Sequence, residues 1–361
     1  MLTSSLLIVI GIVLLVIGAD ALVSGASRIA QRFGIPPLIV GLTIVAIGTS
    51  MPEITVSTTA AMGGNTQLAL GNVVGSNIFN VLLILGLSSV ILPLLVQVSL
   101  VRQEVPVMVG FSLLLFILLF EGSLSKPEAG LLLVLGLSYV FLLISQARKA
   151  VRLDQDMVLN SIEPSGLMSR VPVFVLIALG LIGLIGGAQL LVHGASEIAL
   201  SLGVSDLVVG LTVVAIGTSL PEVAASVAAV LRGERDLAIG NVVGSNVFNI
   251  AFCLGLAGLV APDSLVAPAQ LLAFDLPVMV IVAVCLLPLI ITDYQVSRLE
   301  GVLLLVWSAI YLIWTILKAT AYPMVDLYTD IVLFGMFPLT ILFLIMTVLN
   351  TLRKVNRRDE L

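Results

Sequence analysis

Two glutamates stand alone in long apolar segments of this chain. Glu53 is the only charged residue in segment 33–101, and Glu222 is the only one in segment 207–231. If these segments cross a membrane, an ionised carboxylate there costs at least ~2.5 kcal/mol unless a partner neutralises it. Neither segment contains Lys or Arg, and a bound cation would be such a partner. Two protonated carboxyls with a structural role are the alternative.

Each glutamate belongs to a motif that occurs twice. Segment 41–57, GLTIVAIGTSMPEITVS, aligns with segment 210–226, GLTVVAIGTSLPEVAAS, and 12 of the 17 positions are identical. Chance in so biased a composition would give about two. At the same offset, GNVVGSNIFN at 71–80 matches GNVVGSNVFN at 240–249 in nine of ten positions. The chain therefore contains an internal duplication, which favours a functional role for the repeated glutamates.

The first motif predicts a helix that breaks beside its glutamate. Pro52 has no N–H to give to the Gly48 carbonyl, and its ring clashes with the preceding turn. We therefore expect freed carbonyls from Ala46 to Gly48, and in the second copy from Ala215 to Gly217. Carbonyls at broken helices bind cations in transporters. A helical turn would bring further oxygens to the face of each glutamate, namely the hydroxyls of Thr49, Ser50, Thr218 and Ser219.

The second motif predicts a polar helix face. Its polar side chains recur every four residues in each copy: Asn72, Ser76, Asn80, Asn241, Ser245 and Asn249. We expect four of them to face the same site as the glutamates: Ser76, Asn80, Ser245 and Asn249. We expect the glycines of the motif to let helices approach closely: Gly71, Gly75, Gly240 and Gly244. A purely structural role, with the amides as hydrogen-bonding contacts between helices, stays open.

All of these candidate ligands are hard oxygens. Calcium takes six to eight oxygen ligands in flexible geometry, whereas zinc and copper favour nitrogen or sulfur. Magnesium is disfavoured because it keeps its waters and needs a small octahedral cage. Sodium also accepts oxygen ligands, and neutral hydroxyls and carbonyls suit a monovalent ion. The residues therefore indicate calcium or sodium.

The composition places this site in a membrane protein. The chain has 361 residues, of which 60% are hydrophobic and 10% charged, and its mean hydropathy is +1.23. An ordinary soluble domain is about a quarter charged, so a water-soluble globular protein is excluded. A net charge of −5 leaves no basic field for nucleic acid. Cys253 and Cys285 lie in apolar runs and indicate neither a disulfide framework nor a thiolate metal site.

Apolar runs bounded by charges, Gly or Pro predict eleven membrane-spanning helices. The first five are expected near 5–26, 36–62, 67–92, 105–120 and 127–144, and the second five near 171–192, 205–231, 237–260, 268–291 and 299–317. The eleventh is expected at about 329–349. The fold class is thus all-α and polytopic. We divide the chain into a first repeat (1–145), a charged linker (146–170), a second repeat (171–318) and an extra helix with a basic tail (319–361).

The distribution of Lys and Arg predicts the orientation, because basic residues are retained on the cytoplasmic side. With the N-terminus outside, the outer loops contain only Lys126 and Lys318. The other 14 basic residues fall in inner loops or the tail: Arg28, Arg32, Arg102, Arg148, Lys149, Arg152, Arg170, Arg232, Arg235, Arg298, Arg353, Lys354, Arg357 and Arg358. We expect an integral protein of the cell (inner) membrane with its linker and C-terminus in the cytoplasm.

The number of spans makes the duplication an inverted one. Each half contains five predicted crossings, an odd number, so the second copy must enter the membrane from the opposite side. Inverted repeats with binding elements near the midplane are the architecture of secondary transporters. Alternating access is therefore the expected mechanism.

These motifs resemble those of the sodium/calcium exchanger family within the calcium/cation antiporter superfamily, in its prokaryotic type. Members have two inverted repeats of five helices, each with a Gly-Thr-Ser-x-Pro-Glu helix and a Gly-Asn-x-x-Gly-Ser-Asn helix. The resemblance covers about 6–317 and leaves the eleventh helix unexplained. It implies an ion site of Glu53, Glu222, Thr49, Ser50, Thr218, Ser219, Ser76 and Ser245 with the carbonyls of Ala46 and Ala215. Some members carry Asp in place of Asn249, so stoichiometry and potassium involvement stay open.

The function expected on these grounds is a secondary antiporter that exports calcium against sodium entry. Its partners would be these transported ions and membrane lipid, with no cofactor and no nucleic acid. A proton-coupled or potassium-dependent exchanger on the same scaffold is the alternative. An enzyme such as an intramembrane protease is less favoured, because acid/base pairs do not need broken helices rich in Thr, Ser and Asn. Saturable counter-transport would separate an exchanger from a cation channel.

Overall fold

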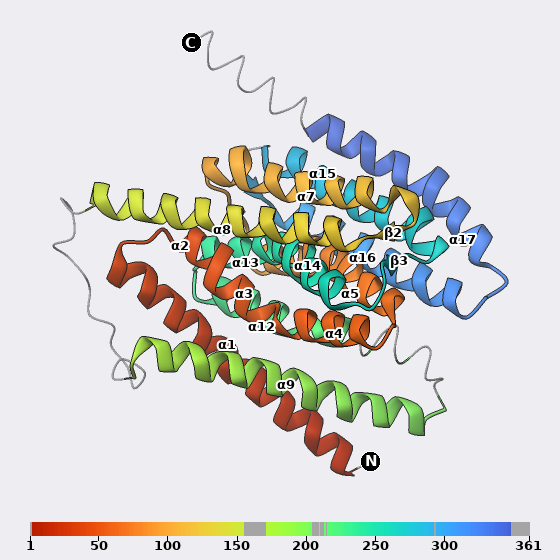
Figure 1. Cartoon of the computed structure of the whole chain (residues 1–361), viewed down its shortest axis with the longest axis horizontal. Coiled ribbons are helices and arrows are strands. Elements are labelled where there is room, and N and C mark those ends of the chain that lie inside the picture. Colours follow the sequence, from red (N-terminus) through yellow and green to blue (C-terminus); the bar gives the residue numbers. More distant parts are fainter. Residues whose placement is uncertain are drawn as a thin grey trace, which may run out of the picture.

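The protein is an all-α polytopic membrane protein. The computed structural model describes residues 2–154, 171–203, 209, 213, 215–291 and 294–347. Within these residues, nine helices are long and apolar enough to cross a membrane. One further pair, Pro37–Thr49 and Met51–Met62, passes the same test together and is bent by 44°. The predicted fold class is therefore confirmed (Figure 1).

The elements follow the predicted order. The first half contains α1 (Leu2–Phe33), α2 (Pro37–Val40), η1 (Gly41–Val45), α3 (Ala46–Thr49), α4 (Met51–Met62), α5 (Thr66–Phe79), η2 (Asn80–Leu85), α6 (Gly86–Ile91), β1 (Leu94–Leu95), η3 (Leu100–Glu104), α7 (Val105–Leu118), η4 (Leu119–Glu121), β2 (Ser123–Leu124) and α8 (Lys126–Asp154). The second half contains α9 (Val173–Ser201), α11 (Ala215–Thr218), α12 (Leu220–Leu231), α13 (Arg235–Phe248), η7 (Asn249–Leu254), α14 (Gly255–Val260), β3 (Leu265–Val266), η8 (Leu271–Asp275), α15 (Leu276–Ile291), β4 (Gln295–Val296) and α16 (Arg298–Ala319). The extra helix begins with α17 (Val325–Ile331) and η9 (Val332–Met336).

Several predicted boundaries differ from the structure or lie outside it. Helix α8 continues to Asp154, so the first part of the expected linker is helical. The rest of the linker, 155–170, lies outside the described residues. The expected span 205–231 is described only in part, chiefly as α11 and α12. The eleventh span covers Val325–Thr347, and the basic tail lies outside the described residues.

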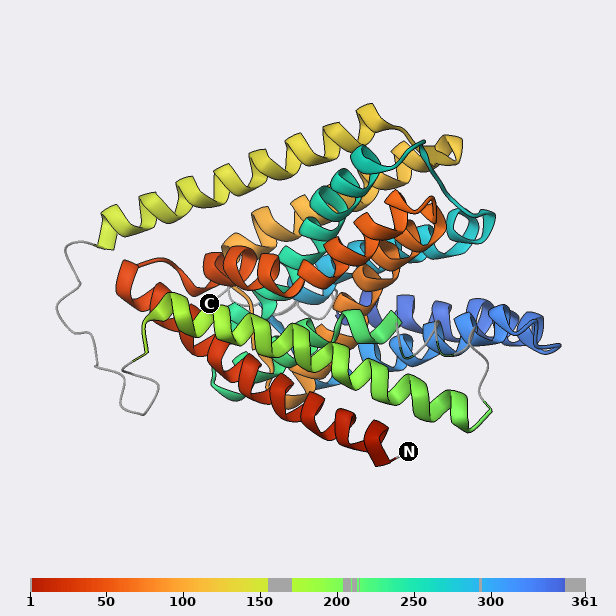
Figure 2. The same ribbon diagram turned by 60° about the horizontal axis from the view of Figure 1, so that its bottom comes forward.

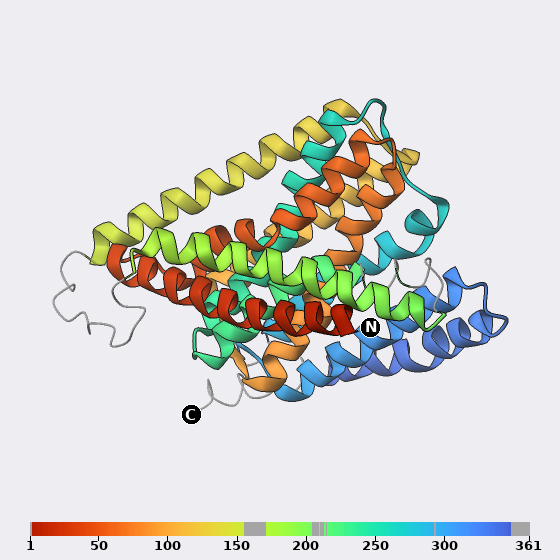
Figure 3. The same ribbon diagram turned by 90° about the horizontal axis from the view of Figure 1, so that it is seen from below.

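The first helices of the two halves, α1 and α9, pack closely along much of their length. Figures 2 and 3 show them side by side at the edge of the molecule. Glycines permit this approach: a Cβ on Gly18 would lie 2.7 Å from the backbone nitrogen of Leu184, and one on Gly187 would lie 2.7 Å from the Gly11 carbonyl oxygen. Small residues at an interface let membrane helices come into backbone contact.

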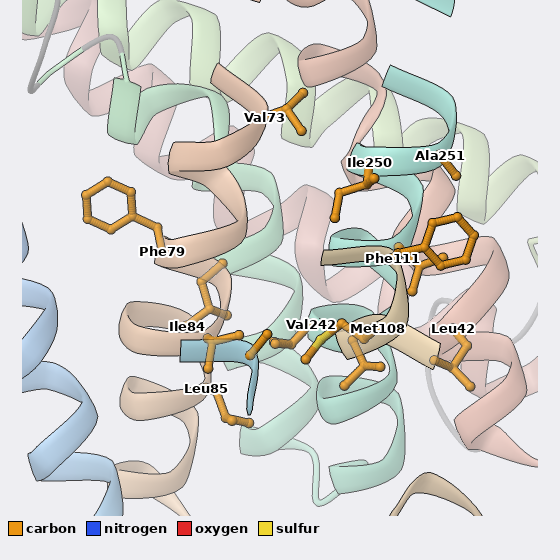
Figure 4. Close-up of a cluster of buried hydrophobic side chains, with 14 of the residues drawn as sticks. Leu42, Val73, Phe79, Ile84, Leu85, Met108, Phe111, Val242, Ile250 and Ala251 are labelled. Atoms are coloured by element: carbon orange, nitrogen blue, oxygen red, sulfur yellow. The ribbon is translucent and has the colours of Figure 1, made fainter. Parts of the chain in front are cut away.

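The two halves also meet through their strands and their central helices. Strand β1 pairs antiparallel with β4, and β2 pairs antiparallel with β3, so each short sheet joins one half to the other. Buried apolar side chains from both halves form the hydrophobic core, which includes Leu42, Val73, Met108, Val242 and Ile250 (Figure 4). The segments that carry the duplicated motifs contribute to this core, with Leu42, Val73 and Val242 among its residues.

The extra helix lies against the outer side of α16 (Figure 1). None of its most apolar stretch is buried within the described structure. The indole N–H groups of Trp307 and Trp314 donate to the hydroxyls of Thr340 and Thr329, each at 3.0 Å. Two tryptophans of α16 therefore attach the extra helix to the second half.

Candidate functional site

Each first-motif helix is interrupted next to its glutamate, as predicted. Helix α3 ends at Thr49 and α4 begins at Met51, with Ser50 between them at φ −80° and ψ 4°. In the second copy Ser219 separates α11 from α12 at φ −88° and ψ 3°. The prolines that follow occupy the first turns of α4 and α12, where a missing N–H costs no helical hydrogen bond.

The expected freeing of the Ala46 carbonyl is not observed. Its oxygen accepts a hydrogen bond from the Ser50 N–H at 3.1 Å and one from the Thr49 hydroxyl at 3.4 Å. Because the break falls at Ser50, the last turn of α3 stays closed. In the second copy, Ala215 is described only as the start of α11. There the Ser219 N–H donates to the Ile216 carbonyl at 3.1 Å.

Glu53 and Glu222 are both fully buried, and each is hydrogen bonded to the opposite repeat. The Ser219 hydroxyl donates to Oε1 of Glu53 at 3.3 Å, and the Ser50 hydroxyl donates to Oε1 of Glu222 at 3.2 Å. Ser76 adds a second hydroxyl on Glu53 at 3.4 Å. The structure thus brings the two carboxylates and these three serines into one cluster.

The remaining polar residues of the motifs extend this cluster. The Asn249 amide donates to the Ser76 hydroxyl at 3.2 Å, and the Ser76 and Ser219 hydroxyls are 3.1 Å apart. The Thr49 hydroxyl donates to Oδ1 of Asn241 at 3.1 Å. In the mirrored contact, the Thr218 hydroxyl donates to the Asn72 Oδ1 at 3.4 Å. Each of these threonines therefore has a contact that links the two halves.

Four buried side-chain oxygens of the predicted site have no hydrogen-bond partner in the described structure. They are Oε2 of Glu53, Oε2 of Glu222, Oδ1 of Asn80 and Oγ of Ser245. A buried acceptor that is left unsatisfied costs about 1–3 kcal/mol, and more when it is charged. Unpaired oxygens of this kind fit the requirements of a hard cation.

The charge of the cluster is not balanced by basic side chains. In the described part of the chain, the ion pairs join His193 to Glu197 and Arg232 to Asp20, and neither involves the buried glutamates. Nowhere in the described part of the chain do three or more His, Cys, Asp or Glu residues form a group that could bind a metal ion. A cation in this cluster would therefore be held by two carboxylates and neutral oxygens.

Sequence reasoning missed four residues that support the cluster. The Ser57 hydroxyl accepts from the Asn72 amide at 3.0 Å, and the Ser226 hydroxyl accepts from the Asn241 amide at 2.9 Å. The buried amides of Asn77 and Asn246 form a further cross-repeat network. All four are identical in the two copies of their motifs, and that identity was the available signal. Counting every fourth residue along one helix does not select them.

The glycine prediction is confirmed for one copy of the second motif. A Cβ on Gly240 would lie 2.7 Å from the Leu38 carbonyl oxygen, and one on Gly244 would lie 2.8 Å from the Leu42 carbonyl oxygen. These residues therefore pack against the segment preceding the break. For Gly71 and Gly75, the equivalent neighbours at 207 and 211 lie outside the described residues.

Comparison with known proteins identifies similar chains over most of the sequence. A model of the family described as sodium/calcium exchanger protein matches residues 3–145 and 172–317. The putative antiporter CaxA of Alkalimonas amylolytica is 40% identical over 308 residues, covering 84% of this chain and 96% of that protein. The sodium/calcium exchanger MaX1 of Methanosarcina acetivorans is 34% identical, with coverage of 85% and 97%. A structure of the sodium-calcium exchanger NCX_Mj, soaked with 10 mM Na⁺ and 10 mM Sr²⁺, matches with a TM-score of 0.72 and 33% identity, covering 84% of this chain and 96% of that one.

Proposed function

The chain belongs to the sodium/calcium exchanger protein family, and on that premise we propose that this cation antiporter exchanges calcium for sodium. The family match covers both halves and ends at residue 317, before the extra helix. The family is one of ion exchangers and not of enzymes. The relatives named as antiporter and sodium/calcium exchanger are matched over nearly their whole length, which supports the same activity here.

The observation that carries the proposal is the pair of buried carboxylates, each with one unpaired oxygen. Glu53 and Glu222 supply two formal negative charges, which one calcium ion cancels. The unpaired Asn80 and Ser245 oxygens would complete part of its coordination shell. The same neutral oxygens would bind sodium when calcium has left. The ion site in this proposal lies between the two repeats, near the middle of the membrane.

Alternating access is the mechanism we propose, and the expected inverted duplication and the contacts between the two halves support it. Each broken helix contributes a hydroxyl to the carboxylate of the other half, so a shift of one half against the other would change both sets of ligands. Transporters built from inverted repeats expose a central site to each side in turn. The N-terminus would lie outside the cell and the linker in the cytoplasm, as the basic residues indicate.

Counter-transport in proteoliposomes tests the proposal. Vesicles loaded with sodium and diluted into sodium-free medium with labelled calcium should accumulate calcium, and collapse of the gradient by a sodium ionophore should stop the uptake. Uptake should saturate with external calcium. Calcium entry that is independent of internal sodium would indicate a channel. Uptake driven instead by a proton or potassium gradient would favour the alternative exchangers on the same scaffold.

A further inference from the structure

Asn77 and Asn246 form a buried amide pair next to the proposed ion site. Each follows the serine of the second motif and is only 2% exposed. They are equivalent residues in the duplication, and neither carries an oxygen that is left unpaired in the described structure. Because an unsatisfied amide would be costly at such burial, their hydrogen bonds define which way the amides point.

Each of these amides accepts a hydrogen bond from a candidate ligand in the opposite repeat. The Asn249 amide Nδ2 donates to Oδ1 of Asn77 at 3.1 Å. The Asn80 amide Nδ2 donates to Oδ1 of Asn246 at 3.0 Å. One bond runs from η7 to α5 and the other from η2 to α13, so each half donates to the asparagine of the other half.

The orientation of each accepting amide is fixed by its second contact. The Nδ2 of Asn77 donates to the backbone carbonyl of Asn246 at 3.2 Å, and a carbonyl cannot donate in return. The Nδ2 of Asn246 contacts Sδ of Met108 at 3.3 Å, and a thioether sulfur is likewise only an acceptor. Turning either amide over would therefore place two acceptors against each other.

The consequence differs for the two candidate ligands. Asn80 gives its N–H to Asn246, which leaves its Oδ1 unpaired and available to a cation. Asn249 gives its N–H to Asn77 and to the Ser76 hydroxyl, and its Oδ1 lies 3.5 Å from the thiol of Cys253. In both halves the amide N–H is thus taken up by protein groups, and the Asn80 oxygen is left unpaired whereas the Asn249 oxygen meets the Cys253 thiol.

We propose that Asn77 and Asn246 are positioning residues that hold the N–H groups of the two amides beside the ions. Asn246 keeps the Asn80 oxygen available as a ligand, and Asn77 holds the Asn249 amide through the equivalent contact. This inference rests on the proposed calcium exchange. It gives two equivalent asparagines of the duplication the same role at one site.

The test uses calcium binding to the purified full-length protein, measured by calorimetry, with Asn246→Leu and Asn77→Leu. Leucine keeps a similar volume and removes both hydrogen bonds. Asn246→Leu frees Asn80 to turn its N–H toward the cation, so the calcium Kd should rise at least about fivefold, the effect of losing one net hydrogen bond or ligand contact. Asn77→Leu frees Asn249 in the same way, but the Asn249 N–H keeps its contact with the Ser76 hydroxyl, so the Kd should rise by less.

A matched control and a conservative variant separate positioning from general loss of structure. Ser112→Ala is the matched control, because among the described residues this buried hydroxyl donates to the Met108 carbonyl of its own helix, at 3.0 Å. It should leave the Kd unchanged. If Asn246→Leu does not fold, Asn246→Thr retains a hydroxyl acceptor for Asn80 and should raise the Kd less than twofold. No change in the Kd for either leucine variant, or a rise for Asn246→Thr as large as that for Asn246→Leu, would overturn the inference.

Wild-type protein in the same experiment distinguishes the two proposals. If wild type binds calcium and shows sodium-dependent uptake, the outcome for the variants bears on the positioning residues alone. If wild type does neither, the proposed function itself is wrong.

Discussion

The hydroxyl of Ser50 donates to Oε1 of Glu222 across 3.2 Å, although the two residues are 172 positions apart in the chain. Ser219 makes the equivalent contact with Glu53 at 3.3 Å. Each carboxylate is therefore held by the break in the other repeat's helix and keeps its second oxygen unpaired. A cluster built this way exists only when the two halves are packed together.

Replacing either glutamate by glutamine should nearly abolish calcium transport. Glu53→Gln or Glu222→Gln keeps the side-chain shape but removes one of the two charges that neutralise calcium. Loss of one partner of a buried charge pair costs about 3–5 kcal/mol, which corresponds to a loss of at least ~100-fold in calcium affinity. Sodium-driven calcium uptake in proteoliposomes measures the effect.

A third buried carboxylate provides the control for these variants. Glu104 is 3% exposed and accepts a hydrogen bond from the Tyr139 hydroxyl at 2.6 Å, outside the proposed site. Glu104→Gln should retain most of the uptake. Wild-type uptake by either Glu53→Gln or Glu222→Gln would remove that residue from the proposed site, and wild-type uptake by both would refute the site altogether.

The glutamates and their serines could be predicted from the sequence because the duplication marks them twice. The position of the helix break could be predicted only approximately. Pro52 disrupts a helix interior, but in the first turn of a new helix it is tolerated, so the break falls at Ser50 and the Ala46 carbonyl keeps its hydrogen bond. The role of Asn77 could not be predicted, because its partner Asn249 is 172 positions away and only packing brings them together.

The close contact between α1 and α9 predicts that Gly187→Ala destabilises the protein. The new Cβ would lie 2.7 Å from the Gly11 carbonyl oxygen and 2.8 Å from the Leu15 backbone nitrogen, so two helix backbones would have to separate. Overpacking of this kind costs about 1–3 kcal/mol. The neighbouring Gly186 has no atom within 4 Å of an added Cβ among the described residues.

Thermal unfolding of both variants in detergent measures this difference. Gly187→Ala should lower the Tm, whereas Gly186→Ala should leave it unchanged or raise it, because alanine favours the helix over glycine by about 1 kcal/mol. Equal Tm values for the two variants would mean that the α1–α9 contact is looser than described.

The proposed orientation predicts that equivalent residues of the two repeats face opposite sides of the membrane. Met62 and Leu231 end α4 and α12, occupy equivalent positions in the duplication and are exposed by 61% and 71%. A membrane-impermeant maleimide added to intact cells should label Met62→Cys and not Leu231→Cys. Labelling of both after permeabilisation is the control for reactivity, and the wild type gives the background from Cys253 and Cys285. The reverse pattern in intact cells would invert the topology.

Asn249→Asp should make exchange depend on a further cation. The two glutamates already supply the charge that one calcium ion cancels, and a third carboxylate would leave the calcium-bound site with an excess of one negative charge. A proton or a potassium ion could balance it. The new oxygen would also replace an N–H donor that lies 3.1 Å from Oδ1 of Asn77, so two acceptors would face each other.

Both effects can be measured in matched proteoliposomes. Sodium-driven calcium uptake by Asn249→Asp should vary more steeply with pH than wild type, or should be stimulated by potassium, and the net charge moved per calcium should change. Adding Asn77→Leu removes the facing oxygen, so the repulsion disappears while the added charge remains, and the dependence on a further cation should persist in the double variant. If the pH profiles, potassium responses and charge movements of Asn249→Asp match those of wild type, Asn249 does not face the ions, and the second motif serves helix packing at this position.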